Sequence, residues 1–165
     1  MMIRRPGRQF LIFLSLVIWG CTTPPVETTR SRPVGVSKNN VLIATQKTKF
    51  KQAVVSEIRT ALNNNSIYTK IIDVKSLRYQ SSQNFSAVVI INRALAGRPD
   101  PRVEIYIDKE PQKNKIIVLT TGILDAWKPD TSGVDAMTSA SVISESDKIA
   151  QKIVSKVLAL VDQNQ

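Results

Sequence analysis

The run AVVIIN (Ala87–Asn92) contains almost nothing but β-branched and apolar residues. A strand with one face in water alternates apolar and polar residues, whereas a strand buried on both faces is apolar throughout. Two further runs have the same character, VLIAT (Val41–Thr45) and KIIVLTT (Lys115–Thr121). A fourth, YTKIIDV (Tyr68–Val74), alternates more and is typical of an edge strand. The sequence therefore predicts a parallel sheet that is covered by helices.

Two long helical patterns accompany these strands. In Lys49–Leu62 the apolar residues recur every four positions and form one stripe, which the three asparagines at 63–65 end. In Ser144–Asp162 the apolar residues again lie on one face, and Ser144 and Asp147 have the spacing of a capping box. Both segments are predicted to pack on the sheet.

Two shorter segments are less regular. Asp100–Asp108 begins with Asp-Pro, a good helix start, but its apolar residues at 103, 105 and 107 also alternate as in a strand. We predict a short helix, because it completes the alternation of strands and helices along the chain. Lys75–Phe85 shows little pattern and is expected to cross over as a loop or a brief turn of helix.

The alternation of strands and helices predicts an α/β fold. Right-handed connections between parallel strands give, most simply, a doubly wound sheet of four parallel strands in the order 2-1-3-4 with flanking helices. Ligands of such sheets bind beyond the carboxyl ends of the strands, where the strand order reverses. We therefore expect a binding crevice between the first and third strands.

The N-terminal residues 1–20 have the pattern of an export signal. Arg4, Arg5 and Arg8 precede the apolar run FLIFLSLVIW, which is too short to span a bilayer and is typical of a signal peptide. The following IWGC (Ile18–Cys21) resembles a bacterial lipobox, in which the cysteine is acylated and becomes the first residue of the mature protein. An ordinary secretory signal beside a free cysteine is the alternative.

The predicted organisation is a signal peptide at 1–20, a lipidated Cys21 with a flexible linker at 21–40, and one folded domain at 41–165. Thr22 resembles the residue after the cysteine in lipoproteins sorted to an outer membrane, which implies its periplasmic face. The net charge of +10 includes several linker cations that suit anionic lipid head groups, although a dispersed solubilising charge explains them equally.

Composition excludes several classes of function. The sequence has no histidine, which removes Ser-His-Asp and Cys-His catalysis and most catalytic zinc sites, so no metal is expected. Its aromatic content of 5% offers little for stacking on bases, and together with the export signal it argues against nucleic acid as a partner. With Cys21 acylated there is no disulfide, so packing alone must stabilise the domain.

The arrangement resembles the flavodoxin-like fold over roughly Val41–Val161. The stretches that carry the resemblance are VLIATQKTKFKQAVVSEI, AVVIINRALAGRPDP and TTGILDAWKPDTSGVDAMTSAS. In flavodoxins the first of these loops binds the phosphate of flavin mononucleotide (FMN), and the other two flank its ring. FMN is thus the cofactor that the resemblance implies. The segment TQKTKF (Thr45–Phe50) departs from the family's phosphate loop because it lacks glycine, so lysine charge would replace backbone cradling.

The predicted crevice gathers seven candidate ligand-binding residues. They are Thr45, Lys47, Thr48, Asn92, Arg98, Thr121 and Trp127. Thr45 and Thr48 either bind an anion or belong to a helix N-cap region with exposed lysines. Trp127 either stacks on a planar ring or covers the end of the sheet. Arg98 pairs either with an anionic ligand or with a nearby aspartate.

The segment GVDAMTSAS (residues 133–141) is rich in small and hydroxylated residues and is predicted to be a loop. Three interpretations stay open: tight packing over the strand ends, hydroxyl groups lining the crevice, and covalent modification. The third rests on the motif D-x-x-[ST]-G-A-[ST] of exported flavin carriers, whose last residue is esterified to FMN. Asp135, Thr138, Ala140 and Ser141 match it, with Ser139 in place of the glycine.

Two hypotheses of function follow. The first is a lipid-anchored, non-catalytic binding module with a flavodoxin-like scaffold, whose ligand is a small anion or a protein partner in the cell envelope. The second is an extracytoplasmic electron carrier that holds FMN reversibly in the crevice or covalently at Ser141. No acid–base pair is evident in the sequence, and a fold by itself does not argue for an enzyme.

Overall fold

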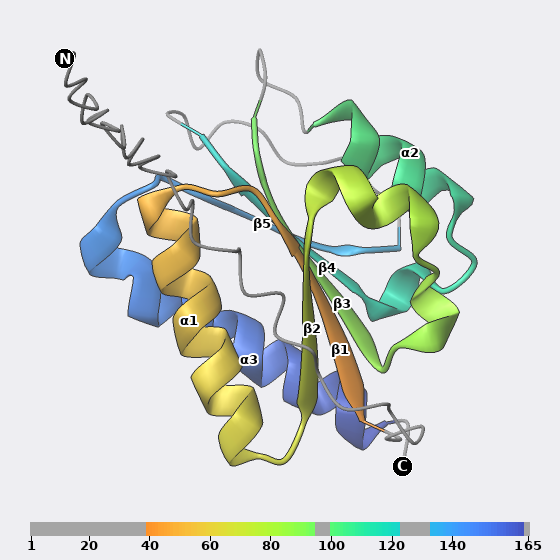
Figure 1. The fold of residues 1–165 in the computed structure, drawn as a ribbon, viewed down its shortest axis with the longest axis horizontal. Coiled ribbons are helices and arrows are strands. Elements are labelled where there is room, and N and C mark those ends of the chain that lie inside the picture. Colours follow the sequence, from red (N-terminus) through yellow and green to blue (C-terminus); the bar gives the residue numbers. More distant parts are fainter. Residues whose placement is uncertain (1–38, 95–99, 123–132, 164–165) are drawn as a thin grey trace, which may run out of the picture. The chain divides into compact units, whose positions relative to one another are not determined.

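The computed structural model describes residues 39–94, 100–122 and 133–163. They form one five-stranded sheet in the order β2-β1-β3-β4-β5, with every neighbouring pair parallel (Figure 1). The strands are β1 (Asn40–Thr45), β2 (Tyr68–Asp73), β3 (Ala87–Arg93), β4 (Ile116–Thr121) and β5 (Asp135–Ser139). Because all strands run the same way, their carboxyl ends share one edge of the sheet.

Helices cover both faces of the sheet (Figure 1). The three α-helices are α1 (Lys49–Asn64), α2 (Pro101–Lys109) and α3 (Ser146–Asp162). Helices α1 and α3 pack side by side on one face, and α2 packs on the other with the short 3-10 helix η1 (Val74–Tyr79). In the described part of the chain, no helix combines the length and the apolar character needed to cross a membrane.

Two apolar clusters lie on opposite faces of the sheet, and alternate residues of each central strand contribute to one or the other. In β1, Val41 and Ile43 point toward α1 and α3, whereas Leu42 and Ala44 point toward α2. All four side chains are fully buried. This two-sided burial is the reason why the central strands are continuous apolar runs.

The predicted α/β class, the parallel sheet and the relative order 2-1-3-4 are confirmed. The run that alternates most, Tyr68–Val74, forms the edge strand β2 as predicted. The ambiguous segment Asp100–Asp108 is the helix α2, whose N-cap Asp100 accepts a hydrogen bond from the backbone N–H of Arg102. The segment after β2 contains η1 and a second short 3-10 helix, η2 (Ser82–Asn84).

The prediction of a loop at 133–141 was wrong for most of its length, and so was the count of four strands. Residues 135–139 form β5, which pairs with β4 from Ile117↔Asp135 to Thr121↔Ser139. An edge strand has one neighbour instead of two, and all five residues of β5 are only partly buried. Small and hydroxylated residues are compatible with such a strand, so its apolar pattern is weak.

The predicted capping box of the last helix was also wrong. Ser144 lies in the short 3-10 helix η4 (Ile143–Glu145), and α3 begins at Ser146 with Glu145 as its N-cap. No side chain caps this helix start with a hydrogen bond. The preceding 3-10 turn shifts the start of α3 by two residues, which removes Ser144 from the N-cap position.

Candidate functional site

The site is built where β1 and β3 end, because this is the point at which the strand order reverses. The chain leaves β1 through Gln46 and enters α1 after Thr48, and it leaves β3 at Arg93. The pairing Thr45↔Ile91 keeps these two exits adjacent. Side chains from both exits and from the start of α2 therefore meet at the predicted edge of the sheet.

Lys51 is the least expected residue of this region. It lies in the first turn of α1 and is only 1% exposed. Its ammonium group donates a hydrogen bond of 2.7 Å to the side-chain oxygen Oε1 of Gln46. Among the described residues it has no ion pair, so a buried positive charge is bonded to a neutral amide.

Gln46 connects Lys51 to a carboxylate. Its Nε2 donates to Oδ2 of Asp100 at 2.9 Å, while its Oε1 accepts from Lys51. Asp100 is 1% exposed and also accepts from Nε of Arg102 at 2.8 Å and from its Nη2 at 2.5 Å. The hydrogen bond from the Arg102 side chain lowers the pKa of the Asp100 carboxyl, which keeps it ionised.

The pKa of Lys51 is lowered from its ordinary 10.5 to about 8. Burial is the main cause, repulsion from Arg93 adds to it, and attraction to Asp100 partly opposes it. Lys51, Arg93 and Arg102 thus carry three positive charges, beside the negative charge of Asp100 and that of Asp73, which also attracts Arg102. The cluster has an excess of positive charge, and such an excess favours the binding of an anion.

Asn92 and Thr121, two of the predicted crevice residues, lie at this end of the sheet but are buried. The Asn92 amide donates to Oγ1 of Thr120 at 3.0 Å, and its Oδ1 accepts from the backbone N–H of Asp100 at 3.3 Å. The Thr121 hydroxyl donates to the Asn92 carbonyl oxygen at 3.0 Å. Their hydrogen bonds brace the ends of β3 and β4 and position Asp100.

The three predicted residues of the first loop lie between the end of β1, where Thr45 is the last residue, and the start of α1. Thr48 is the N-cap of α1, and its Oγ1 accepts from the backbone N–H of Lys51 at 3.3 Å. Thr45 and the exposed Lys47 line a cavity of about 400 Å³ between α1 and β2. The N-cap interpretation therefore holds for Thr48.

Three of the predicted residues, Cys21, Arg98 and Trp127, lie outside the described residues. The motif proposed for flavin attachment is spread along β5 and beyond it. Asp135 begins the strand and pairs with Lys156 of α3. Ser141 follows the strand as an exposed residue, on the same side of the sheet as the other carboxyl ends.

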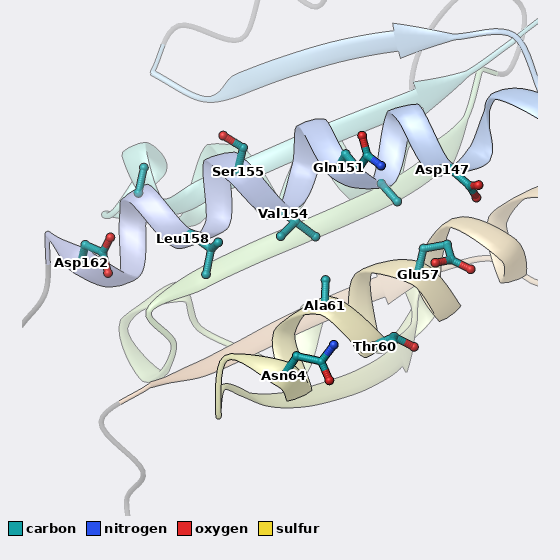
Figure 2. A pocket seen from close by; sticks show the side chains of 12 residues that line it. Glu57, Thr60, Ala61, Asn64, Asp147, Gln151, Val154, Ser155, Leu158 and Asp162 are labelled. Carbon is teal, nitrogen blue, oxygen red and sulfur yellow. The ribbon is translucent and has the colours of Figure 1, made fainter.

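A groove of about 710 Å³ runs between α1 and α3 on the outer side of these helices (Figure 2). Ala61, Val154 and Leu158 face the space between the two helices, and Glu57 and Asp162 lie at its ends (Figure 2). None of the predicted site residues with a described position lines this groove. In the described ranges, no three His, Cys, Asp or Glu side chains gather as metal ligands do.

The sequence analysis missed the residues that form the charged cluster. A signal for Lys51 was available, because it precedes Val54, Val55 and Ile58 by three, four and seven positions. These spacings place residues on one face of a helix, so a lysine stood where the pattern calls for an apolar residue. No comparable signal marked Gln46, whose role depends on contacts made 54 residues away.

Comparison with known proteins places the fold. The chain superposes on a flavodoxin from Megasphaera elsdenii with a TM-score of 0.53 and 14% identity, over 72% of this chain and 98% of that one. It superposes on an oxidoreductase from Corynebacterium diphtheriae with a TM-score of 0.51 and 12% identity, over 77% and 99% of the two chains. The fold is flavodoxin-like.

The rubredoxin oxygen:oxidoreductase of Desulfovibrio gigas also matches, with a TM-score of 0.51 and 10% identity over 76% of this chain. The chain spans only 37% of that larger protein. No family model matches the sequence, and no curated protein matches it. Identities this low establish the scaffold and leave the activity to be argued from the site.

Proposed function

We propose that this protein is a lipid-anchored, non-catalytic binding protein of the cell envelope, and that its flavodoxin-like domain binds a small anion where β1 and β3 end. The observation that carries the proposal is Lys51, which is buried with its charge on a neutral amide. A buried charge is stable only when it is compensated. An anion at this position would supply the missing compensation.

The other two cations make the cluster accessible from solvent. Arg93 is exposed at the end of β3, and the side chain of Arg102 is 45% exposed. We infer that the anion contacts these guanidinium groups, which suit the oxygens of phosphate, sulfate or carboxylate. The buried ammonium group of Lys51, which Gln46 holds in place, attracts the anion electrostatically from the interior side of the site.

The proposed loop is a degenerate form of the flavodoxin phosphate loop. The segment Thr45–Phe50 has no glycine, and the hydroxyl group of Thr48 is already used as the cap of α1. Side-chain charge therefore replaces the close backbone cradle that glycine permits. A site that relies on side-chain charge favours a small anion over a phosphate group that backbone amides must enclose.

Anchoring at Cys21 is proposed from the sequence alone. The export signal and the lipobox-like IWGC support a position outside the cytoplasm, with acyl chains that tether the domain to a membrane. We propose the periplasmic face of an outer membrane, and a protein partner in the envelope as a further binding function. Labelling cells with a clickable fatty acid would test the anchor, because Cys21→Ser must abolish the label.

An FMN-dependent electron carrier is the second candidate. It is supported by the flavodoxin-like scaffold, which covers 98% of the Megasphaera flavodoxin, and by the exposed position of Ser141 after β5. The site could offer the FMN phosphate Arg93, Arg102 and Lys51, and FMN would supply the redox chemistry. Protein produced with its native export machinery would be yellow, and Ser141→Ala would remove any colour that survives denaturation.

Titration calorimetry in a low-salt buffer measures the affinity for sulfate, and it tests the anion site without any redox readout. Sulfate is expected to bind the unmodified protein and to lose most of its affinity in Lys51→Met and in Arg93→Gln. Lys152→Met, which removes an exposed lysine of α3, serves as the matched control and should leave the affinity unchanged. Equal affinity in all four proteins contradicts the proposal, and tight FMN binding without sulfate binding favours the carrier.

A further inference from the structure

The cavity between α1 and the edge strand β2 has a composition that the anion site does not explain. It encloses about 400 Å³, which lies within the range of small-molecule sites. Gln52, Val55, Ser56 and Arg59 line it from α1, and their spacing places them on one face of that helix. We propose that this cavity binds a single-chain amphipathic anion, an acyl chain with a carboxylate or phosphate head.

The apolar part of the cavity comes from Val55 of α1 and from Ile71 and Ile72 of β2. Val55 of α1 is 8% exposed, and Ile71 of β2 is 42% exposed. Ile71 stays open to water, whereas Ile43 on the neighbouring strand is fully buried at the paired position. A bound hydrocarbon chain would cover Ile71 and complete the apolar layer at this edge of the sheet.

The polar part of the cavity is cationic. Lys47 and Arg59 both line it, and within the described residues neither side chain forms an ion pair or a hydrogen bond. The single carboxylate in the lining, Asp73, accepts from the backbone N–H of Lys75 at 2.8 Å, and with the two cations it leaves the lining one net positive charge. Two free cations beside an apolar surface match a ligand with an anionic head and an apolar body.

The cavity is separate from the charged cluster around Lys51, so this inference goes beyond the proposed anion site and does not depend on it. Lys51 does not line the cavity. Gln46 belongs to both sites, but its side-chain amide is held by Lys51 and Asp100. The Gln46 side chain in the cavity lining is therefore already ordered without a ligand, which reduces the side-chain entropy lost on binding.

Calorimetry and amide chemical shifts of the full-length protein with decanoate, below the micelle concentration of decanoate, test the proposal. Decanoate is expected to bind about fifteenfold more tightly than octanoate, because two methylene groups are added. Decanol and decyltrimethylammonium, which lack the negative charge, must bind more weakly. Decanoyl lysophosphatidate distinguishes the two sources: tighter binding than decanoate identifies a phospholipid headgroup, and weaker binding identifies a free fatty acid.

Substitutions assign the binding to this cavity. Ile71→Thr keeps a β-branched residue in the strand and should weaken decanoate binding roughly fourfold or more. Arg59→Gln should weaken it about threefold. The matched controls are Ile105→Thr, at a 53% exposed isoleucine of α2, and Lys152→Gln.

Three results would overturn the proposal. The first is that decanol and decanoate bind with equal affinity. The second is that decanoate causes no chemical-shift changes at Val55 and Ile71. The third is that the control variants lose as much affinity as the cavity variants. Lys51→Met separates the two sites, because it should abolish sulfate binding and leave decanoate binding intact. If Lys51→Met abolishes decanoate binding as well, the acyl anion occupies the charged cluster and the cavity is not its site.

Discussion

Replacing Lys51 by methionine should stabilise the protein at neutral pH. Methionine is unbranched, fills a similar space and is a good helix former, so the first turn of α1 stays intact. In the wild type, burial and the repulsion from Arg93 lower the pKa of Lys51 from 10.5 to about 8. The native state therefore binds this proton less tightly than the unfolded chain does. The free energy of unfolding is reduced by the full amount below about pH 8, and by less and less as the pH rises from 8 to 10.5.

The size of the effect follows from the two pKa values. Their difference corresponds to a cost of roughly 3 kcal/mol at pH 7, which shrinks to about 1 kcal/mol at pH 9.5, because the native state has released the proton there while the unfolded chain still holds it. Methionine removes this cost but also loses the hydrogen bond to Gln46, worth about 1 kcal/mol. The net stabilisation is expected to be about 2 kcal/mol at pH 7 and close to zero at pH 9.5.

Urea unfolding of the wild type and of Lys51→Met at pH 7, 8 and 9.5 measures this difference. Lys152→Met is the control for a general loss of positive charge, and it should change the free energy of unfolding by less than about 0.5 kcal/mol. If Lys51→Met destabilises the protein by an amount that does not vary with pH, the ammonium group is compensated in the native state. The argument for an unsatisfied charge, and with it the anion site, would then fail.

Three further predictions follow from individual contacts. Sulfate affinity should fall about tenfold for each pH unit above 8, because binding requires the protonated form of Lys51, and calorimetry at constant ionic strength measures it. Thr48→Ala should lower the free energy of unfolding by about 1 kcal/mol in a urea melt, because the N-cap hydrogen bond of α1 is lost. Glu110→Ala should lower the free energy of unfolding by about 2 kcal/mol. The Oε2 of Glu110 accepts hydrogen bonds from the backbone N–H of the buried Ser82 at 2.6 Å and from its hydroxyl group at 2.5 Å. Lys109→Ala, at an exposed neighbouring residue, is the control.

The central strands, the two long helices and the order of the first four strands were predictable from the amino-acid sequence. A strand inside a doubly wound sheet must be apolar on both faces. Ala87–Asn92 and the other central strands can therefore be recognised as strands from their own residues, without knowledge of their neighbours. The apolar stripe of a long amphipathic helix such as α1 is likewise visible in a short segment of sequence. The fold class therefore followed from residues that are close together in the chain.

The end of the sheet and the composition of the site became evident only from the folded arrangement. The strand β5 has one neighbour and is partly exposed, so its residues need no apolar pattern, and only its pairing with β4 shows that it is a strand. The burial of Lys51 depends on Gln46 and Asp100, which are brought together across 54 residues. Burial and charge balance are properties of what packs around a side chain, and a linear pattern does not contain them.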